Sequence, residues 1–349
     1  ATASMSEADT VGRELATQQQ LMIATVVFTL PLMLFSLPSA LIADRYSKRS
    51  IILAAKVLEF LVMLGGVVVL YFNPLGGVLT FAMLALMGLQ SAIFGPAKYG
   101  IMPQLCDEKA ITRGNGMLEL WTFMAIIGGY VAGGALSDWT KPDRGYLAML
   151  LLAGLSFVGL IAALRVPKVA AVSTADGLMT PMRDAWRAIV SNRNLKLVIL
   201  GQTVFWMLVS LLSQDIFTYA LEVLKVDGTE AGMTFAAFGV GIGIGSVLAG
   251  RISNHGIEPG LIPLGAVGLA FGTTAIGLLV PGYWGTLAWM GMLGVAAAFV
   301  VVPLESMLQW YSPATRRGAV IAIANVPIFA GVMAGSVKSI DWILKINAA

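Results

Sequence analysis

Ten apolar runs, each long enough to cross a bilayer, dominate the sequence. The hydrocarbon core of a bilayer is about 30 Å thick and needs roughly 20 apolar residues per helix. Charged residues make up only 12% of the chain, whereas a soluble domain carries roughly 25%. We therefore predict an all-α integral membrane protein. The predicted spans lie near residues 19–43, 51–72, 77–95, 116–137, 146–165, 197–221, 230–250, 260–281, 285–302 and 318–337.

The basic residues set the orientation of these spans. Fifteen of the 22 Lys and Arg residues fall on one set of alternating loops and four on the other, and such an excess marks the cytoplasmic side. Because these residues lie in loops between apolar runs, the net charge of +3 does not indicate a nucleic-acid partner. This orientation places residues 1–18 outside the cell without a span to carry them there. We therefore expect a first helix before them and a last helix after residue 337, both missing from this chain.

The long polar loop over residues 166–195 divides the spans into five before it and five after it. We predict an N-terminal helix bundle over residues 1–165, consisting of an outer loop and five spans. A cytoplasmic linker follows over residues 166–195, and its stretch from Met179 to Arg193 has the pattern of an amphipathic helix on the membrane surface. The C-terminal bundle, with five spans and a short tail, occupies residues 196–349.

The two groups of spans share a local pattern. Each contains a Gly-rich or Ala-rich run, a Pro, a short basic loop, an Arg-Gly pair and then a span rich in small residues. Parallel repeats of this kind build two pseudo-symmetric bundles around a site near the membrane midplane. Chance similarity among apolar segments is the alternative. The matching positions are Gly88, Pro96 and Arg113-Gly114 in the first group, and Gly294, Pro303 and Arg317-Gly318 in the second.

A charged loop joins the first two spans. It places Asp44 and Arg45 at a helix end and a basic pair, Lys48 and Arg49, just after it. An acid at such a position can pair with loop bases in one conformation and lose them in another, which is the behaviour of a conformational switch. We include Arg113, in the basic loop of the repeat, in this switch. The alternative is an ordinary cytoplasmic basic loop that contains one acid.

Ionisable residues inside spans are costly and usually face a cavity or one another. Lys56 and Glu59 are three apart on one predicted helix, which favours a structural ion pair. Glu119 lies about one turn inside its span and is either a pair partner of Arg113 or a contact for a lipid headgroup. Asp215 has no basic residue at three or four residues' distance, so we predict that it lines a cavity.

Glycines recur at helical spacing in several spans. In lipid, small residues four apart let helices approach closely. The run Gly241 to Gly245 has alternating glycines that could be misread as a phosphate-binding fingerprint, but it lies inside an apolar span without a preceding strand. We interpret it as a packing surface.

One segment is more specific than the rest. The residues from Gly88 to Gln104 read GLQSAIFGPAKYGIMPQ, and those from Gly114 to Glu119 read GNGMLE. Together with the Asp44-Arg45 loop, they resemble the lysophospholipid transporter family of the major facilitator superfamily. The similarity is greatest to the transporter domain that some bacteria fuse to a 2-acylglycerophosphoethanolamine acyltransferase.

This resemblance implies a flippase of the bacterial inner membrane that moves lysophosphatidylethanolamine-like lipids inward for reacylation. Its partners would be the lysophospholipid, membrane lipids and a fused or separate acyltransferase. Lys98, Tyr99 and Glu119 would contact the headgroup, and Phe205 and Trp206 would flank the acyl chain. We add Asp215 as a cavity residue and expect no metal, cofactor or catalytic residue.

Three other functions compete with this hypothesis. A proton-coupled exporter of drugs or metabolites needs a titratable acid in a cavity, and Asp215 or Glu119 could serve. The acyltransferase itself needs a His-x4-Asp motif, but His255, the only histidine, is followed five positions later by Gly260. A membrane scaffold that transports nothing is the third alternative.

Overall fold

The computed structural model describes residues 7–74, 76–140, 144–170, 179–226, 228–254 and 256–346, and these residues form helices and connecting turns without a strand. The first half contains α1 (Glu7–Arg45), α2 (Lys48–Phe72), α3 (Val78–Gly100), α4 (Met102–Leu105), α5 (Glu108–Thr140) and α6 (Gly145–Ala163). The second half contains α7 (Met179–Ser191), α8 (Arg193–Glu222), α9 (Gly228–Ile252), α10 (Leu261–Leu279), α11 (Tyr283–Tyr311), the 3₁₀ turn η2 (Ala314–Arg316) and α12 (Arg317–Ile346).

The ten long helices match the ten predicted spans in order. Eight segments of the described residues are long and apolar enough to cross a membrane; α1 contributes the shorter apolar stretch Ile23–Ser39. Large apolar side chains such as Leu278, Phe271 and Leu155 are exposed, which suits a surface that faces lipid. The all-α membrane fold predicted from the sequence is therefore confirmed.

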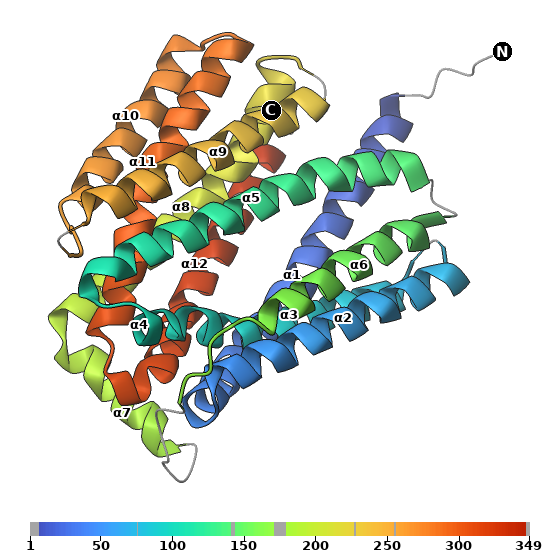
Figure 1. Ribbon diagram of the computed structural model, residues 1–349. Coiled ribbons are helices and arrows are strands. Elements are labelled where there is room, and N and C mark those ends of the chain that lie inside the picture. The colour runs from blue at the N-terminus through green and yellow to red at the C-terminus, as the bar shows by residue number, and fades with distance from the viewer. Residues whose placement is uncertain are drawn as a thin grey trace.

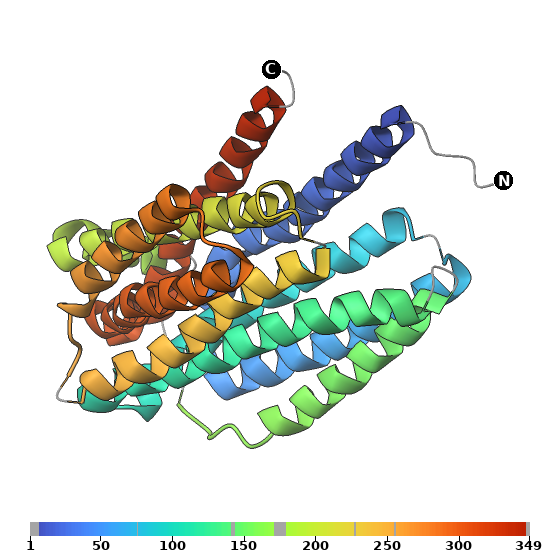
Figure 2. The ribbon, with the colours of Figure 1, turned by 90° about the horizontal axis from the view of Figure 1, so that it is seen from above.

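Both ends of the chain are more helical than expected. We predicted an outer loop before residue 19, but residues 7–18 already belong to α1. We also predicted a polar tail after residue 337, but α12 continues to Ile346. Helix propensity and hydrogen bonding extend helices past the apolar core of a span, where hydropathy no longer marks them. Figure 2 shows these ends of α1 and α12 projecting from the same side of the molecule.

The helix contacts reproduce the predicted repeat. Within the first half α1 packs on α3, and within the second half α9 packs on α11. Between the halves, α1 contacts α12 and α5 contacts α9, and these two interfaces correspond because α1 matches α9 and α5 matches α12 in the repeat. In Figure 1, α1, α2, α3 and α6 lie on one side and α8 to α11 on the other. Two pseudo-symmetric bundles are thus formed.

Glycines allow the closest contact within the second half. A Cβ atom on Gly294 would stand 2.0 Å from the Phe238 carbonyl oxygen, and one on Gly241 would stand 2.0 Å from the Gly291 carbonyl oxygen. The backbones of α9 and α11 therefore touch, as the spacing of glycines in the sequence predicted. The linker helix α7 is also present; Ala185 and Ile189 are buried on one face, while Trp186 and Val190 are exposed on the other.

We predict that Gly294→Ala lowers the thermal stability of the purified protein, because the added methyl group must push α11 away from α9. Overpacking of this kind costs about 1–3 kcal/mol. The matched control is Gly277→Ala on α10, where a Cβ would meet no atom within 4 Å. Thermal unfolding in detergent measures both variants, and equal melting temperatures for the two would contradict the close contact.

Candidate functional site

The last turn of α3 reaches α5 through two neighbouring polar side chains. Lys98 Nζ donates a hydrogen bond to Thr122 Oγ1 at 3.0 Å, and the Tyr99 hydroxyl donates one to Glu119 Oε1 at 3.2 Å. Glu119 is only 3% exposed. It lies six residues beyond Arg113 on α5, about 9 Å further along the helix. The structure therefore brings together Lys98, Tyr99 and Glu119, which the sequence analysis selected.

A second carboxyl group joins them from the other half of the molecule. Glu305 on α11 interacts electrostatically with both Lys98 and Glu119, and the fully buried side chain of Gln202 on α8 lies beside it. We call these six residues the central polar cluster: Lys98, Tyr99, Glu119, Thr122, Gln202 and Glu305. Glu305 is not among the residues predicted from the sequence, because the predicted span ends at residue 302, just before Pro303, whereas α11 continues to Tyr311.

The central polar cluster therefore spans both bundles. Tyr99 and Trp206 both pack against the large apolar core, most of which belongs to the second half. Phe205 and Trp206 follow Gln202 by three and four residues on α8, and their rings meet edge to face at 5.5 Å between centroids. Two aromatic side chains thus lie within about one turn of Gln202, and polar groups next to apolar ones suit an amphipathic ligand.

Asp215 is not part of this cluster. It lies thirteen residues beyond Gln202 on α8, about 20 Å along the helix axis. It is partly buried and has an interaction partner of its own. Asp215 therefore lies at a different depth in the membrane from the other residues that the sequence predicts to contact the substrate.

Buried amides connect the halves next to the central polar cluster. Asn115 Nδ2 donates to Gln309 Oε1, and Gln309 Nε2 donates back to Asn115 Oδ1, both at 3.1 Å. Asn115 also donates to Ser306 Oγ at 3.1 Å. We call these three residues the amide lock; none of them is more than 1% exposed. Glu119 is one turn from Asn115, and Glu305 is one turn from Gln309, so the lock sets the register that brings the two carboxyl groups together.

The residues of the predicted switch lie in different places in the described structure. Arg49 Nη2 donates to the Leu164 carbonyl oxygen at 2.9 Å, which links α2 to the end of α6 within the first half. Lys48 is buried, with its Cε 3.0 Å from the Cβ position of Gly100, and Arg45 is exposed. Arg113 alone lies at the α5–α9 interface, against Gly250. The side chain of Asp44 lies outside the described part of the structure, so the switch stays a prediction.

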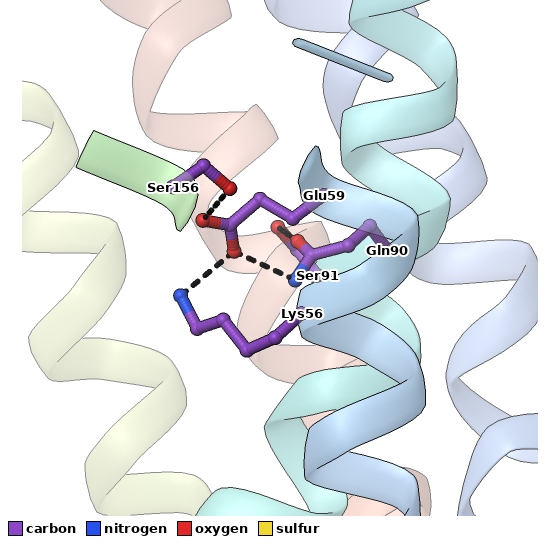
Figure 3. Close-up of polar contacts among 5 residues, drawn as sticks. All are labelled: Lys56, Glu59, Gln90, Ser91 and Ser156. Atoms are coloured by element: carbon purple, nitrogen blue, oxygen red, sulfur yellow. Dashed lines mark hydrogen bonds and ion pairs between the residues drawn. The ribbon is translucent and has the colours of Figure 1, made fainter. Parts of the chain in front are cut away.

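A second polar cluster surrounds Glu59 (Figure 3), and among the described residues its hydrogen bonds all lie within the first bundle. Lys56 Nζ and Glu59 Oε2 form the predicted ion pair at 2.8 Å. Gln90 Nε2 donates to the same carboxyl oxygen at 3.1 Å, and Ser156 Oγ donates to the other oxygen at 3.0 Å. These contacts join α2, α3 and α6. The structural interpretation of Lys56 and Glu59 is therefore confirmed.

Comparisons with known proteins agree with the fold. The sequence profile of the Major Facilitator Superfamily matches residues 2–336. The lysophospholipid transporter LplT of Photorhabdus laumondii is 27% identical over 315 residues, which cover 87% of this chain and 75% of that protein. LplT of Citrobacter koseri is 28% identical over 317 residues, with the same coverage of each chain. The resemblance to the lysophospholipid transporter family is therefore confirmed, whereas the likeness to a domain fused to an acyltransferase stays a prediction.

Solved structures support the same fold. The transporter FucP in its outward conformation superimposes with a TM-score of 0.72 at 12% identity, covering 95% of this chain and 84% of that one. The proton:xylose symporter XylE gives a TM-score of 0.67 at 18% identity, covering 93% and 79%. The fold and the profile identify a multi-pass membrane transporter, and a bacterial inner membrane fits the sources of the relatives.

We predict that Glu59→Leu and Lys56→Met each lower stability, because either change leaves one charge of the pair without its partner inside the bundle. The expected loss is about 2–3 kcal/mol for each single variant. The double variant should regain at least half of it, because no uncompensated charge is left. Thermal unfolding of the four proteins measures this cycle, and strictly additive losses would show that the two residues do not act as a pair.

We also predict that Asn115→Leu loosens the contact between the two halves. Interhelical hydrogen bonds in membranes contribute about 1–2 kcal/mol, so the ratio of closed to open forms should fall roughly five- to thirtyfold. Spin labels on Lys109→Cys and Glu258→Cys, in a Cys106→Ser background, report the distance between the halves by electron paramagnetic resonance. Asn73→Leu, outside the interface, is the control. An unchanged distance distribution in Asn115→Leu would contradict the lock.

Proposed function

Because the chain belongs to the Major Facilitator Superfamily, we propose that it carries lysophospholipids, of the lysophosphatidylethanolamine type, from the outer to the inner leaflet of the inner membrane. The observation that carries this proposal is the central polar cluster, in which one amine and two carboxyl groups from both halves meet beside an aromatic surface. The names of the relatives from Photorhabdus laumondii and Citrobacter koseri support the same substrate class.

The charges of the cluster complement a zwitterionic headgroup. Moving such a headgroup through hydrocarbon without polar partners costs several kcal/mol. In our proposal Lys98 and the Tyr99 hydroxyl bind the phosphate, and Glu119 and Glu305 bind the ammonium group. With two carboxyl groups for one amine, the site favours a headgroup that carries its own cation.

The acyl chain needs an apolar surface next to the charged groups. Phe205 and Trp206 supply one, within one turn of Gln202 on α8. A lysophospholipid has a single chain, so one aromatic surface on one side of the cluster is sufficient. Reacylation of the delivered lipid by a fused or separate acyltransferase stays a prediction from the sequence.

A proton-coupled exporter is the second candidate. It is favoured by one observation, the presence of two carboxyl groups, Glu119 and Glu305, within electrostatic range of one another. Such a pair could bind a proton in one conformation and release it in the other. The two candidates therefore share residues and differ in substrate and in the need for a proton gradient.

Transport measurements separate these candidates. In proteoliposomes, wild-type protein should move labelled lysophosphatidylethanolamine into the albumin-protected leaflet without a pH gradient. Lys98→Met and Glu119→Gln should each reduce this rate at least about tenfold, since each removes a charge-assisted contact. The controls are Lys109→Met and Glu108→Gln, exposed residues of the same types at the start of α5.

Two results would overturn the lipid proposal. One is wild-type transport rates in both cluster variants at equal expression. The other is the absence of lysolipid movement together with gradient-dependent uptake of a drug or metabolite, which would favour the exporter.

A further inference from the structure

A small pocket lies between α5 and α9, outside the central polar cluster. Its volume is about 130 Å³, and it is lined by Arg113, Met117, Ser246, Val247, Gly250 and Arg251. We call it the two-arginine pocket. We propose that it binds the phosphate of an anionic phospholipid from the cytoplasmic leaflet. This proposal does not depend on the transported substrate.

Glycines create the geometry of the pocket. A Cβ on Gly116 would stand 2.4 Å from the Ser246 carbonyl oxygen, and one on Gly250 would stand 3.0 Å from Arg113 Cα. The backbones of α5 and α9 therefore touch here. Arg113 and the neighbour of Gly250, Arg251, are both exposed, one from each half of the molecule. Two positive charges, one from each half, thus lie where the backbones of α5 and α9 meet.

Within the part of the chain that the structure describes, the polar groups of this pocket lack protein partners. Neither the Arg113 nor the Arg251 guanidinium makes a hydrogen bond or ion pair with the described residues. Ser246 is fully buried, and its hydroxyl has no hydrogen-bond partner in the described structure. Buried polar groups nearly always have partners in native proteins, and adjacent like charges repel one another. A phosphate would provide a hydrogen-bond partner for these groups and would reduce the repulsion between the two arginines, because arginine binds phosphate oxygens in bidentate geometry.

The surroundings indicate that this phosphate belongs to a lipid. From the pocket, exposed apolar side chains continue along both helices at four-residue spacing, namely Met117 and Trp121 on α5, and Leu248 and Ile244 on α9. They form a surface for acyl chains that leads to the two arginines. The arginines lie on the side of the membrane with the excess of basic residues, and basic pockets between spans on that side suit anionic headgroups.

A lipid in this position would bridge the halves. Its phosphate would bind one arginine from each bundle and reduce the repulsion between them. This adds a contact to the conformation in which the cytoplasmic ends of α5 and α9 meet. Anionic lipid should therefore stabilise the protein in this conformation, whereas a zwitterionic lipid of the same chain length should do so less.

Native mass spectrometry of the purified protein in detergent tests the proposal, with phosphatidylglycerol, phosphatidylethanolamine and inorganic phosphate as separate probes. Wild type should bind phosphatidylglycerol most tightly. The double variant Arg113→Gln with Arg251→Gln should bind it roughly 30-fold more weakly, since each basic residue near the surface contributes about a fivefold gain in affinity. Ser246→Ala, which keeps both arginines, should weaken binding less.

The matched control neutralises two exposed basic residues elsewhere on the same side, Arg165→Gln with Lys196→Gln. An equal loss of affinity in this control would overturn the site, because the effect would then come from general surface charge. Equal binding of phosphatidylethanolamine would overturn the requirement for an anion. Equal stabilisation by inorganic phosphate alone, measured as a shift in melting temperature, would overturn the lipid and leave a free anion as the ligand.

Discussion

The reciprocal hydrogen bonds between Asn115 and Gln309 are the interaction on which the central site depends. A primary amide inside a membrane protein is costly unless both its donor and its acceptor are satisfied. These two amides satisfy one another across the interface between the bundles. Because Glu119 and Glu305 are each one helical turn away, the same contact that joins the bundles also determines which charged groups face one another.

Two acidic residues show how context decides between structure and function. Glu59 accepts hydrogen bonds from Lys56, Gln90 and Ser156, all within the first bundle, so its contacts need not change when the bundles move. Glu119 instead shares its surroundings with Glu305 from the other bundle. Any movement of the bundles changes the electrostatic environment of Glu119, and this sensitivity is what a transport site requires.

The sequence predicts the spans, the repeat and part of the site, since hydropathy and residue spacing are local properties. Lys98, Tyr99 and Glu119 could be selected because they lie in one motif. Glu305 could not, because the predicted span ends at residue 302; proline is tolerated inside membrane helices, and α11 continues past Pro303. The pairing of Asn115 with Gln309 joins residues 194 positions apart, and no local pattern predicts such a contact.

The burial of the amide lock from solvent has a consequence for the kinetics of the protein. When the lock separates, the amides of Asn115 and Gln309 lose their partners at the same moment, and only water can replace them. Opening toward the cytoplasm must therefore draw solvent into the space between α5 and α11. The rate of that step should depend on water activity, so that large osmolytes excluded from the gap would slow this opening while leaving ligand binding on the other side unaffected.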